Sequence, residues 1–324
     1  MQGKIGLEEH FAGEETLADS RGFVGEELWR VLREQLLDVG ERRLAEMDRY
    51  GMERMIVSLN APAVQRIQDA RKAAEAARRA NYMLAAYIGR RPERFSGFAA
   101  LAMQDPDLAA GELERCVKQL GFVGALVNGY SQLESAENCV YYDARQYWPF
   151  WGAVEALDVP FYLHPREPSQ RKAYEGHPWL VGPAYGFAAE TGLHALRLLG
   201  SGLFDRYPGL KLVLGHMGEN LPFALYRSDR RIAWSPMGYP AQKTFSEYFQ
   251  RNVYITTAGN FRTQTLIDCM LELGADRILF STDYPFEQVK EAAEWFDAAP
   301  ISEADRVKIG RSNAAKLFKL EIRR

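Results

Sequence analysis

Side chains that can bind a metal ion stand at the ends of apolar segments that lie far apart in the sequence. Glu8 and His10 end the segment KIGLEEH, His164 ends PFYLH, and Asp283 follows RILFST. His216 follows the apolar segment LKLVLG. Imidazole nitrogens and carboxylate oxygens suit Zn²⁺ or Mn²⁺ in sites that keep positions open for water or substrate. If the fold brings these segment ends together, we expect a metal centre built from Glu8, His10, and a histidine and an aspartate from other segments.

The first of these segments also suggests which side chains face the site. Side chains alternate along a strand, so Glu8 and His10 should point the same way and Glu9 the opposite way. If Leu7 packs outward against helices, Glu8 and His10 face the mouth of the site. Glu9 is then a supporting residue behind the ligands or a partner for a helix.

Each of these motifs alone has an ordinary explanation. A Glu-x-His at a strand end is usually surface chemistry, LGHMGE could begin a helix, and STDYP could be an aspartate that caps a loop. Their occurrence at four segment ends of one chain favours a common site. His194, in the helical pattern AETGLHALRLL, is expected to be a structural histidine. His177, on a long loop, could approach the site, but a structural role is the better expectation.

The elements that must position these residues follow a repeating pattern. Short apolar runs typical of strands buried on both faces alternate with helical segments. Helices are predicted at 69–90, at 105–120 with Asp and Pro at its start and Gly121 after it, and at 261–274. Eight such repeats predict an α/β fold, a (β/α)8 TIM barrel, in which the carboxyl ends of all strands meet at one face. The eight strand candidates are 4–10, 54–60, 95–101, 122–129, 160–165, 210–218, 253–259 and 277–285.

The chain shows no linker that would divide it. No Gly/Ser-rich or Pro-rich stretch interrupts the 324 residues, so we expect a single domain over residues 1–324. Two stretches fall outside the repeat, at about 12–37 after the first strand and 166–187 after the fifth. Both follow the carboxyl end of a strand, where long loops build active sites in barrels.

Composition narrows the classes of partner. The formal net charge is −3 and no basic cluster combines with aromatic residues, which argues against nucleic acid or an acidic membrane surface as a partner. No uninterrupted apolar run approaches membrane-spanning length. Three cysteines without a C-x-x-C pair do not suggest a disulfide framework. These features predict a cytoplasmic protein.

Several strings resemble a known family. EEHF, FYLHP, LGHMGE and FSTDYPFE look like the amidohydrolase superfamily in its decarboxylase branch, and GFVGALVNG, EGHPWLVGP and TTAGNFRTQTLID extend the resemblance over nearly the whole chain. Hydrolases of this superfamily commonly have His-x-His where this chain has Glu8-x-His10. They often carry a bridging lysine at the end of the fourth strand, where this chain has Asn128. Both departures favour a decarboxylase with a single metal ion.

The resemblance implies roles for individual residues. The metal ligands would be Glu8, His10, His164 and Asp283, holding one divalent ion, Zn²⁺ or Mn²⁺, per subunit. Asp283 would also be the catalytic acid. The other residues that the resemblance places at the substrate are His216, Glu219, Arg227, Asn128, Phe23 and Phe286. The resemblance also implies a homotetramer.

The implied reaction is the reversible, non-oxidative decarboxylation of an ortho-hydroxybenzoate, a small aromatic acid. The first expectation is conversion of 2,6-dihydroxybenzoate to resorcinol and CO₂, with 2,3-dihydroxybenzoate and salicylate as alternatives. A metal-activated water attacking an aromatic lactone or an amide is a rival that could use the same ligands. A barrel that binds a ligand or partner without catalysis is a second rival.

Overall fold

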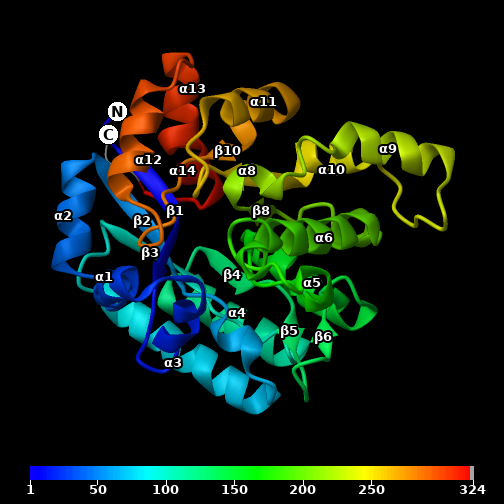
Figure 1. The fold of residues 1–324 in the computed structure, drawn as a ribbon, viewed down its shortest axis with the longest axis horizontal. Helices are drawn as coiled ribbons and strands as arrows, with labels where there is room; N and C mark the ends of the chain where they lie inside the picture. Colours follow the sequence, from blue (N-terminus) through cyan, green and yellow to red (C-terminus); the bar gives the residue numbers. More distant parts are fainter. Residues whose placement is uncertain (322–324) are drawn as a thin grey trace.

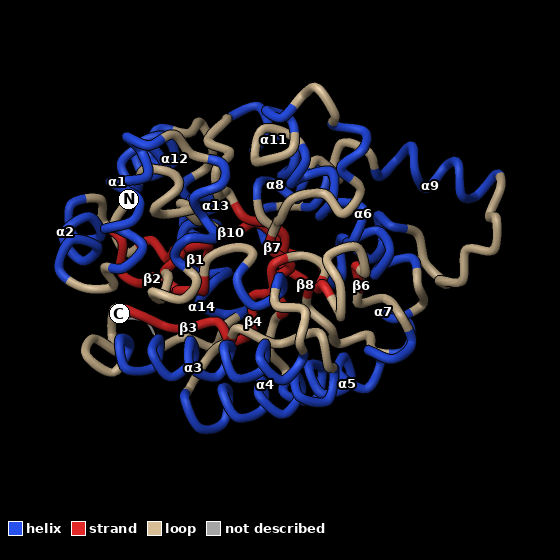
Figure 2. The backbone as a smooth tube through the Cα atoms, turned by 60° about the horizontal axis from the view of Figure 1, so that its bottom comes forward, coloured by secondary structure: helices blue, strands red, loops and turns tan. Residues whose placement is uncertain are grey.

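The computed structural model describes residues 1–321, except for the side chain of Phe23. Eight parallel strands lie at the centre, in the order β1-β2-β3-β4-β7-β8-β9-β10, and helices surround them (Figures 1 and 2). The strands are β1 (Lys4–Phe11), β2 (Met52–Leu59), β3 (Phe95–Ala99), β4 (Gly124–Asn128), β7 (Phe161–His164), β8 (Leu212–Leu214), β9 (Val253–Thr256) and β10 (Ile278–Leu279). The ring closes where the His10 amide donates to the Tyr284 carbonyl at 2.6 Å. The predicted (β/α)8 barrel is therefore confirmed.

The helices follow the strands as the repeat predicts. Asp69 caps α3 by accepting from the Lys72 amide at 2.9 Å, and Asp105 caps α4. Gly121 ends α4 with a left-handed φ of 70°, which glycine adopts without steric cost. The helices are α1 (Glu26–Leu37), α2 (Glu41–Arg49), α3 (Ala70–Ile88), α4 (Pro106–Leu120), α5 (Trp148–Leu157), α6 (Gly186–Gly200), α7 (Leu203–Arg206), α8 (His216–Glu219), α9 (Leu225–Trp234), α10 (Phe245–Asn252), α11 (Thr263–Leu273), α12 (Val289–Ala298), α13 (Glu303–Val307) and α14 (Asn313–Leu317).

The barrel interior is a packed core. Nearly every central strand contributes an inward apolar or aromatic side chain, and residues of α14 and its C-cap Phe318 close one end. The Phe318 ring packs edge-on against Phe98, with centroids 5.5 Å apart. The inward residues of the strands are Ile5, Leu7, Ile56, Phe98, Leu126, Tyr162, Val213 and Leu279. A core of this kind leaves only the carboxyl ends of the strands free to build a site.

The condition that Leu7 packs outward against helices is not met, and a β-bulge explains why Glu8 and His10 still face the site. Leu7 belongs to the barrel interior rather than to the layer between strands and helices. Between Gly6 and Glu9, β1 advances three residues while β2 advances two, from Met55 to Val57. The extra residue shifts the phase of the alternation, so Leu7 and Glu8 both point inward. After the bulge Glu9 points outward and His10 inward, as predicted.

Six strands, from β3 to β10, are shorter than the predicted apolar runs, and the difference is greatest for β8 and β10. Strand β8 ends at Leu214, and β10 spans only Ile278–Leu279. The residues that follow leave the extended conformation because His216 and Asp283 have φ of 49° and 68°. Both predicted runs therefore contained the beginning of a functional loop.

The segments predicted as insertions lie beside the carboxyl ends of the strands. The first contains a 3₁₀ turn, Leu17–Phe23, followed by α1. The second contains the turns Arg171–Tyr174 and Pro178–Leu180 before α6 begins. A small antiparallel ribbon, β5 (Ser131–Gln132) with β6 (Cys139–Val140), follows β4. Within residues 1–321, no helix combines the length and the apolar character needed to cross a membrane.

Candidate functional site

Four predicted metal ligands converge where their strands end. Glu8 and His10 come from β1, His164 ends β7, and Asp283 follows β10. Each offers one ligand atom, and these atoms all lie within 4.8 Å of one another. Ligands about 2.2 Å from one ion lie within roughly 4.4 Å of each other, so this arrangement is already close to what a single cation needs.

Unpaired polar atoms mark the same place. Glu8 and His10 are fully buried, yet Glu8 Oε1 and His10 Nε2 have no hydrogen-bond partner among the described residues. His164 Nε2 lies 3.1 Å from Glu8 Oε1, and Asp283 Oδ1 lies 3.4 Å from His10 Nε2. Buried polar atoms without partners are costly, and a divalent cation would compensate for both. The residues present therefore fit a metal ion.

Neighbouring side chains orient the ligands. The Ser58 Oγ lies 3.2 Å from His10 Nδ1, which leaves His10 Nε2 facing the site. The Tyr162 hydroxyl donates to Glu8 Oε2, and the Thr256 hydroxyl donates to the same oxygen at 3.2 Å. One oxygen of Glu8 is thus held by hydroxyl groups while the other remains free for a ligand bond.

The charge states of the ligands also suit a cation. Burial opposes the charge on Glu8, but the surrounding His216, His164 and His10 hold the pKa of this carboxyl far below its usual range. Burial lowers the pKa of His164, which keeps its imidazole neutral. An ionised carboxylate and a neutral imidazole are the forms that bind metals.

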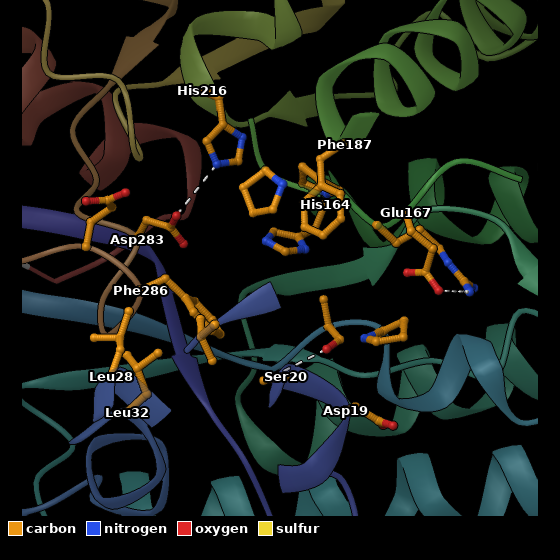
Figure 3. Close-up of a pocket in the computed structure, with 17 residues that line it drawn as sticks. Asp19, Ser20, Leu28, Leu32, His164, Glu167, Phe187, His216, Asp283 and Phe286 are labelled. Carbon is orange, nitrogen blue, oxygen red and sulfur yellow. Dashed lines mark hydrogen bonds and ion pairs between the residues drawn. The ribbon is translucent and has the colours of Figure 1, made fainter. Parts of the chain in front are cut away.

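His216 faces the ligands from a strained turn. Its Nε2 lies 3.7 Å from both Glu8 Oε1 and Asp283 Oδ2, and the contact with Asp283 is drawn in Figure 3. Its Nδ1 lies 2.7 Å from Glu219 Oε1. Burial opposes the positive charge, yet Glu219 first, then Glu8 and Asp283, raise the pKa of His216 well above its ordinary value. His216 Nε2 therefore faces the site, and Glu219 behind the ring favours the protonated form of the imidazole.

A small cavity lies above these residues. It has a volume of about 180 Å³, and Figure 3 shows His164, His216 and Asp283 on one side of it and the labelled Leu28, Leu32 and Phe286 on another. The Phe286 ring lies 5.6 Å from the His10 ring, measured between centroids. An aromatic and aliphatic wall beside a cation site can accept an aromatic ring whose polar groups face the cation.

A second lobe joins this cavity. It shares His216, Asp283 and Glu287 with the first and adds Glu219 and Asn260 to its lining. Burial first, then the charge of Asp283, raises the pKa of Glu287 to about 7. The sequence reasoning missed Glu287, although its position four residues after Asp283 could have indicated it. It also missed Tyr162, which shares a strand face with His164.

Of the other predicted site residues, one lies beside the candidate ligands, one lies outside the cavity and one has a side chain that the structure does not describe. Asn128 ends β4 directly beside His164 in the sheet, and its Nδ2 donates to the Asn60 carbonyl at 3.1 Å. Arg227 lies exposed on α9 and is absent from the lining of both lobes. Phe23 has a side chain outside the described part of the structure.

The two other histidines lie away from the ligands. His194 is buried, and its Nε2 accepts the Tyr142 amide at 3.1 Å. His177 is exposed, and its ring lies 5.1 Å from that of Trp179.

Comparison with known proteins places this arrangement in a family. The amidohydrolase family profile matches residues 38–320. The chain is 62% identical to a γ-resorcylate decarboxylase of Polaromonas sp. (strain JS666) over 99% of both chains. A crystal structure of 2,6-dihydroxybenzoate decarboxylase with 2,6-dihydroxybenzoate has a TM-score of 0.97 and 61% identity, covering 99% of this chain and 100% of the other.

A second solved structure carries a metal ion. The dihydroxybenzoic acid decarboxylase of Polaromonas sp. JS666, with bound manganese and the inhibitor 2-nitroresorcinol, has a TM-score of 0.96 and 62% identity. It covers 98% of this chain, and this chain covers 97% of it. The resemblance found in the sequence is confirmed, and the chain belongs to the amidohydrolase family, in its decarboxylase branch.

Proposed function

We propose that this protein is a metal-dependent, non-oxidative decarboxylase of ortho-hydroxybenzoates. Its best substrate is 2,6-dihydroxybenzoate, which it converts reversibly to resorcinol and CO₂. The observation that carries this proposal is the meeting of Glu8, His10, His164 and Asp283 beside a small cavity with an apolar wall. The substrates of the relatives that are about 60% identical over the full length agree with it.

The cofactor in this proposal is one divalent ion per subunit, Mn²⁺ or Zn²⁺, held by Glu8, His10, His164 and Asp283. Manganese is the first choice because a solved relative contains it. When bound, such an ion would fix and neutralise the carboxylate and phenolate oxygens of the substrate.

The protein side chains must then deliver a proton to carbon. Direct loss of CO₂ would leave an aryl carbanion, so the ring carbon that carries the carboxylate has to be protonated first. Asp283 is the proposed donor, since it lies at the floor of the cavity beside His10 and His216. The bond to the carboxylate then breaks, its electrons return to the ring, and CO₂ leaves.

The other residues hold the substrate and exclude water. The charged His216 donates Nε2–H to a substrate oxygen, and Glu219 keeps the imidazole in place. Phe286 packs against the ring, and Asn128 and Phe23 complete the pocket. These roles follow from the positions of His216 and Phe286 in the cavity wall and, for Asn128 and Phe23, from the resemblance.

We also propose a homotetramer, in which α9, the helix that carries Arg227, lies at an interface between subunits. Helix α9 projects from the barrel in Figures 1 and 2 and carries exposed Tyr226 and Trp234, 74% and 69% accessible. Exposed aromatic residues on one projecting segment are typical of an interface. We also propose a cytoplasmic location, because the three cysteines do not suggest a disulfide framework.

The decisive experiment is a substrate panel with CO₂ detection on protein of measured metal content. The panel contains 2,6-dihydroxybenzoate, 2,3-dihydroxybenzoate, salicylate and an aromatic lactone. We expect the largest kcat/KM for 2,6-dihydroxybenzoate. Metal-loaded protein that releases no CO₂ from any hydroxybenzoate would refute the proposal, and hydrolysis of the lactone alone would replace it with a hydrolase.

A further inference from the structure

Glu9 holds the chain on both sides of Asp283. The Glu9 carboxylate is fully buried and accepts the Thr282 amide at 3.0 Å, the Thr282 hydroxyl at 2.5 Å and the Tyr284 amide at 3.3 Å. We propose that Glu9 is a positioning residue that fixes Asp283 for metal binding and proton delivery. This inference rests on the proposed function for its catalytic part, and on geometry alone for its metal-binding part.

Asp283 needs such support because its backbone is strained. Its φ is 68°, in the left-handed region that residues with a Cβ rarely adopt. The turn that follows is closed by the Phe286 and Glu287 amides, which both donate to the Asp283 carbonyl. If residue 283 relaxed to a right-handed conformation, its Cβ would turn and its carboxylate would leave His10 and His216. Strain of this kind persists only where the surroundings impose it.

Strand β1 is built to place Glu9 at this point. The bulge between Gly6 and Glu9 turns Glu9 away from the ligand face while Glu8 and His10 point into it. A Cβ on residue 6 would lie 2.3 Å from Glu9 Oε1, so the carboxylate occupies space that only glycine leaves open. The same strand therefore supplies two ligands directly and fixes a third through Glu9.

A second set of contacts holds the same two segments. The Glu8 amide donates to Ser281 Oγ at 2.7 Å, and Ser281 Oγ lies 3.4 Å from Glu9 Oε1. The buried Arg43 donates Nη2 to the His10 carbonyl at 2.5 Å, and its guanidinium lies 4.8 Å from the Tyr284 ring centroid. The positive charge of Arg43 also helps to compensate for the buried carboxylate. Strand β1 and residues 281–284 thus form one rigid unit.

The first test is Glu9→Gln, which keeps the size of the side chain. A glutamine amide has only one acceptor oxygen, and its NH₂ group would face a donor from Thr282 or Tyr284. We expect the Kd for Mn²⁺, measured by titration calorimetry without substrate, to rise about 10- to 100-fold. At saturating Mn²⁺ we expect kcat to fall about 10-fold or more with KM nearly unchanged, because Asp283 rather than the ring pocket is disturbed.

A matched control separates positioning from general stability. Glu112 accepts from Asn81 and Arg115, where α3 and α4 pack outside the barrel. Glu112→Gln should lower the melting temperature and leave the Kd for Mn²⁺ and kcat unchanged. If Glu112→Gln weakens Mn²⁺ binding as much as Glu9→Gln does, or if Glu9→Gln binds Mn²⁺ and turns over like the native protein, the inference is wrong.

Two further variants keep the test usable if Glu9→Gln does not fold. Gly6→Ala should displace the Glu9 carboxylate and weaken Mn²⁺ binding. Thr282→Val should do the same to a smaller degree, and Thr282→Ser should restore binding because it keeps the hydroxyl. Normal Mn²⁺ binding by both Gly6→Ala and Thr282→Val would overturn the inference. If the native protein releases no CO₂ yet Glu9→Gln weakens Mn²⁺ binding, the proposed function fails and the positioning role stands.

Discussion

His216 Nδ1 lies 2.7 Å from Glu219 Oε1 across a left-handed turn of the backbone. All five residues from His216 to Asn220 have positive φ, between 49° and 81°. A left-handed conformation costs roughly 1–2 kcal/mol for each residue with a Cβ, so this turn is maintained by its surroundings. It places Glu219 behind the imidazole and leaves Nε2 to face Glu8 and Asp283.

Glu219→Gln should therefore damage catalysis more than stability. The substitution removes the largest influence that keeps His216 charged and its ring fixed. We expect kcat/KM for 2,6-dihydroxybenzoate to fall about 100-fold, the scale for losing one donor aimed at developing charge. Steady-state kinetics and thermal melting on the same preparation check this. Native kcat/KM in the variant would remove His216 and Glu219 from the proposed mechanism.

Tyr162→Phe should weaken metal binding without touching a ligand. The Tyr162 hydroxyl donates to Glu8 Oε2, and its loss leaves only the Thr256 hydroxyl, at 3.2 Å, to hold that oxygen in place. We expect the Kd for Mn²⁺ to rise about 10- to 100-fold. Tyr147→Phe is the matched control, because the Tyr147 hydroxyl donates at 2.7 Å to the Met103 carbonyl away from the ligands. Equal effects of the two variants would contradict the role of Tyr162.

The barrel and the meeting of the four candidate ligands could be predicted because both depend on patterns within single segments. Apolar runs ending in Glu8, His10, His164 and Asp283 mark strand ends, and parallel strand ends meet at one face. The bulge in β1 has no such signal. It belongs to the pairing of β1 with β2 between Gly6 and Glu9, and the inward direction of Leu7 follows from that pairing.

The roles of residues that act through contacts between distant segments could not be predicted from the sequence either. Glu9 could be placed opposite Glu8 and His10, but its partners are Thr282 and Tyr284, more than 270 residues away. Arg227 shows the converse. The resemblance to the family implied a pocket residue, yet Arg227 lies exposed on α9 and does not line the cavity of its own chain.

Asp283→Asn should abolish turnover while the protein still folds. Asparagine keeps the shape of the side chain but cannot deliver the proton, and a general acid contributes about 10²- to 10⁴-fold. We expect kcat to fall at least about 1,000-fold, and binding of 2,6-dihydroxybenzoate, followed by calorimetry at saturating Mn²⁺, to persist. Because Asp283 is also a proposed ligand, metal content must be measured in the same sample. An active variant would exclude Asp283 as the proton donor.

Removal of the metal should abolish activity reversibly. The unpaired Glu8 Oε1 and His10 Nε2 indicate a site that is incomplete without a cation. Dialysis against a chelator should reduce CO₂ release to background, and added Mn²⁺ should restore it. Glu8→Ala should resist restoration because it removes a ligand. Full activity in chelated protein that elemental analysis shows to be free of metal would contradict the metal-dependent mechanism.

His194 should make stability depend on pH although it lies outside the catalytic site. Burial, followed by the charge of Arg197, lowers the pKa of His194 to about 3. The unfolded chain takes up a proton below about pH 6.5, whereas the folded protein does not. The contribution of His194 is therefore fully present above about pH 6.5 and is lost as the pH falls toward 3.

The comparison is between the native protein and His194→Gln, whose amide oxygen can still accept the Tyr142 amide but cannot titrate. Urea unfolding at pH 7.5 and 5.0, with chelator present, gives the loss of unfolding free energy in each protein. We expect the native protein to lose about 2 kcal/mol more than the variant. The reason is that pH 5.0 lies about 1.5 units below the pKa of histidine in the unfolded chain, and each unit corresponds to about 1.4 kcal/mol. All other titrating groups are shared, so they cancel in the difference. An equal loss in both proteins would mean that His194 is protonated in the folded state, and the burial of its ring would then not control its charge.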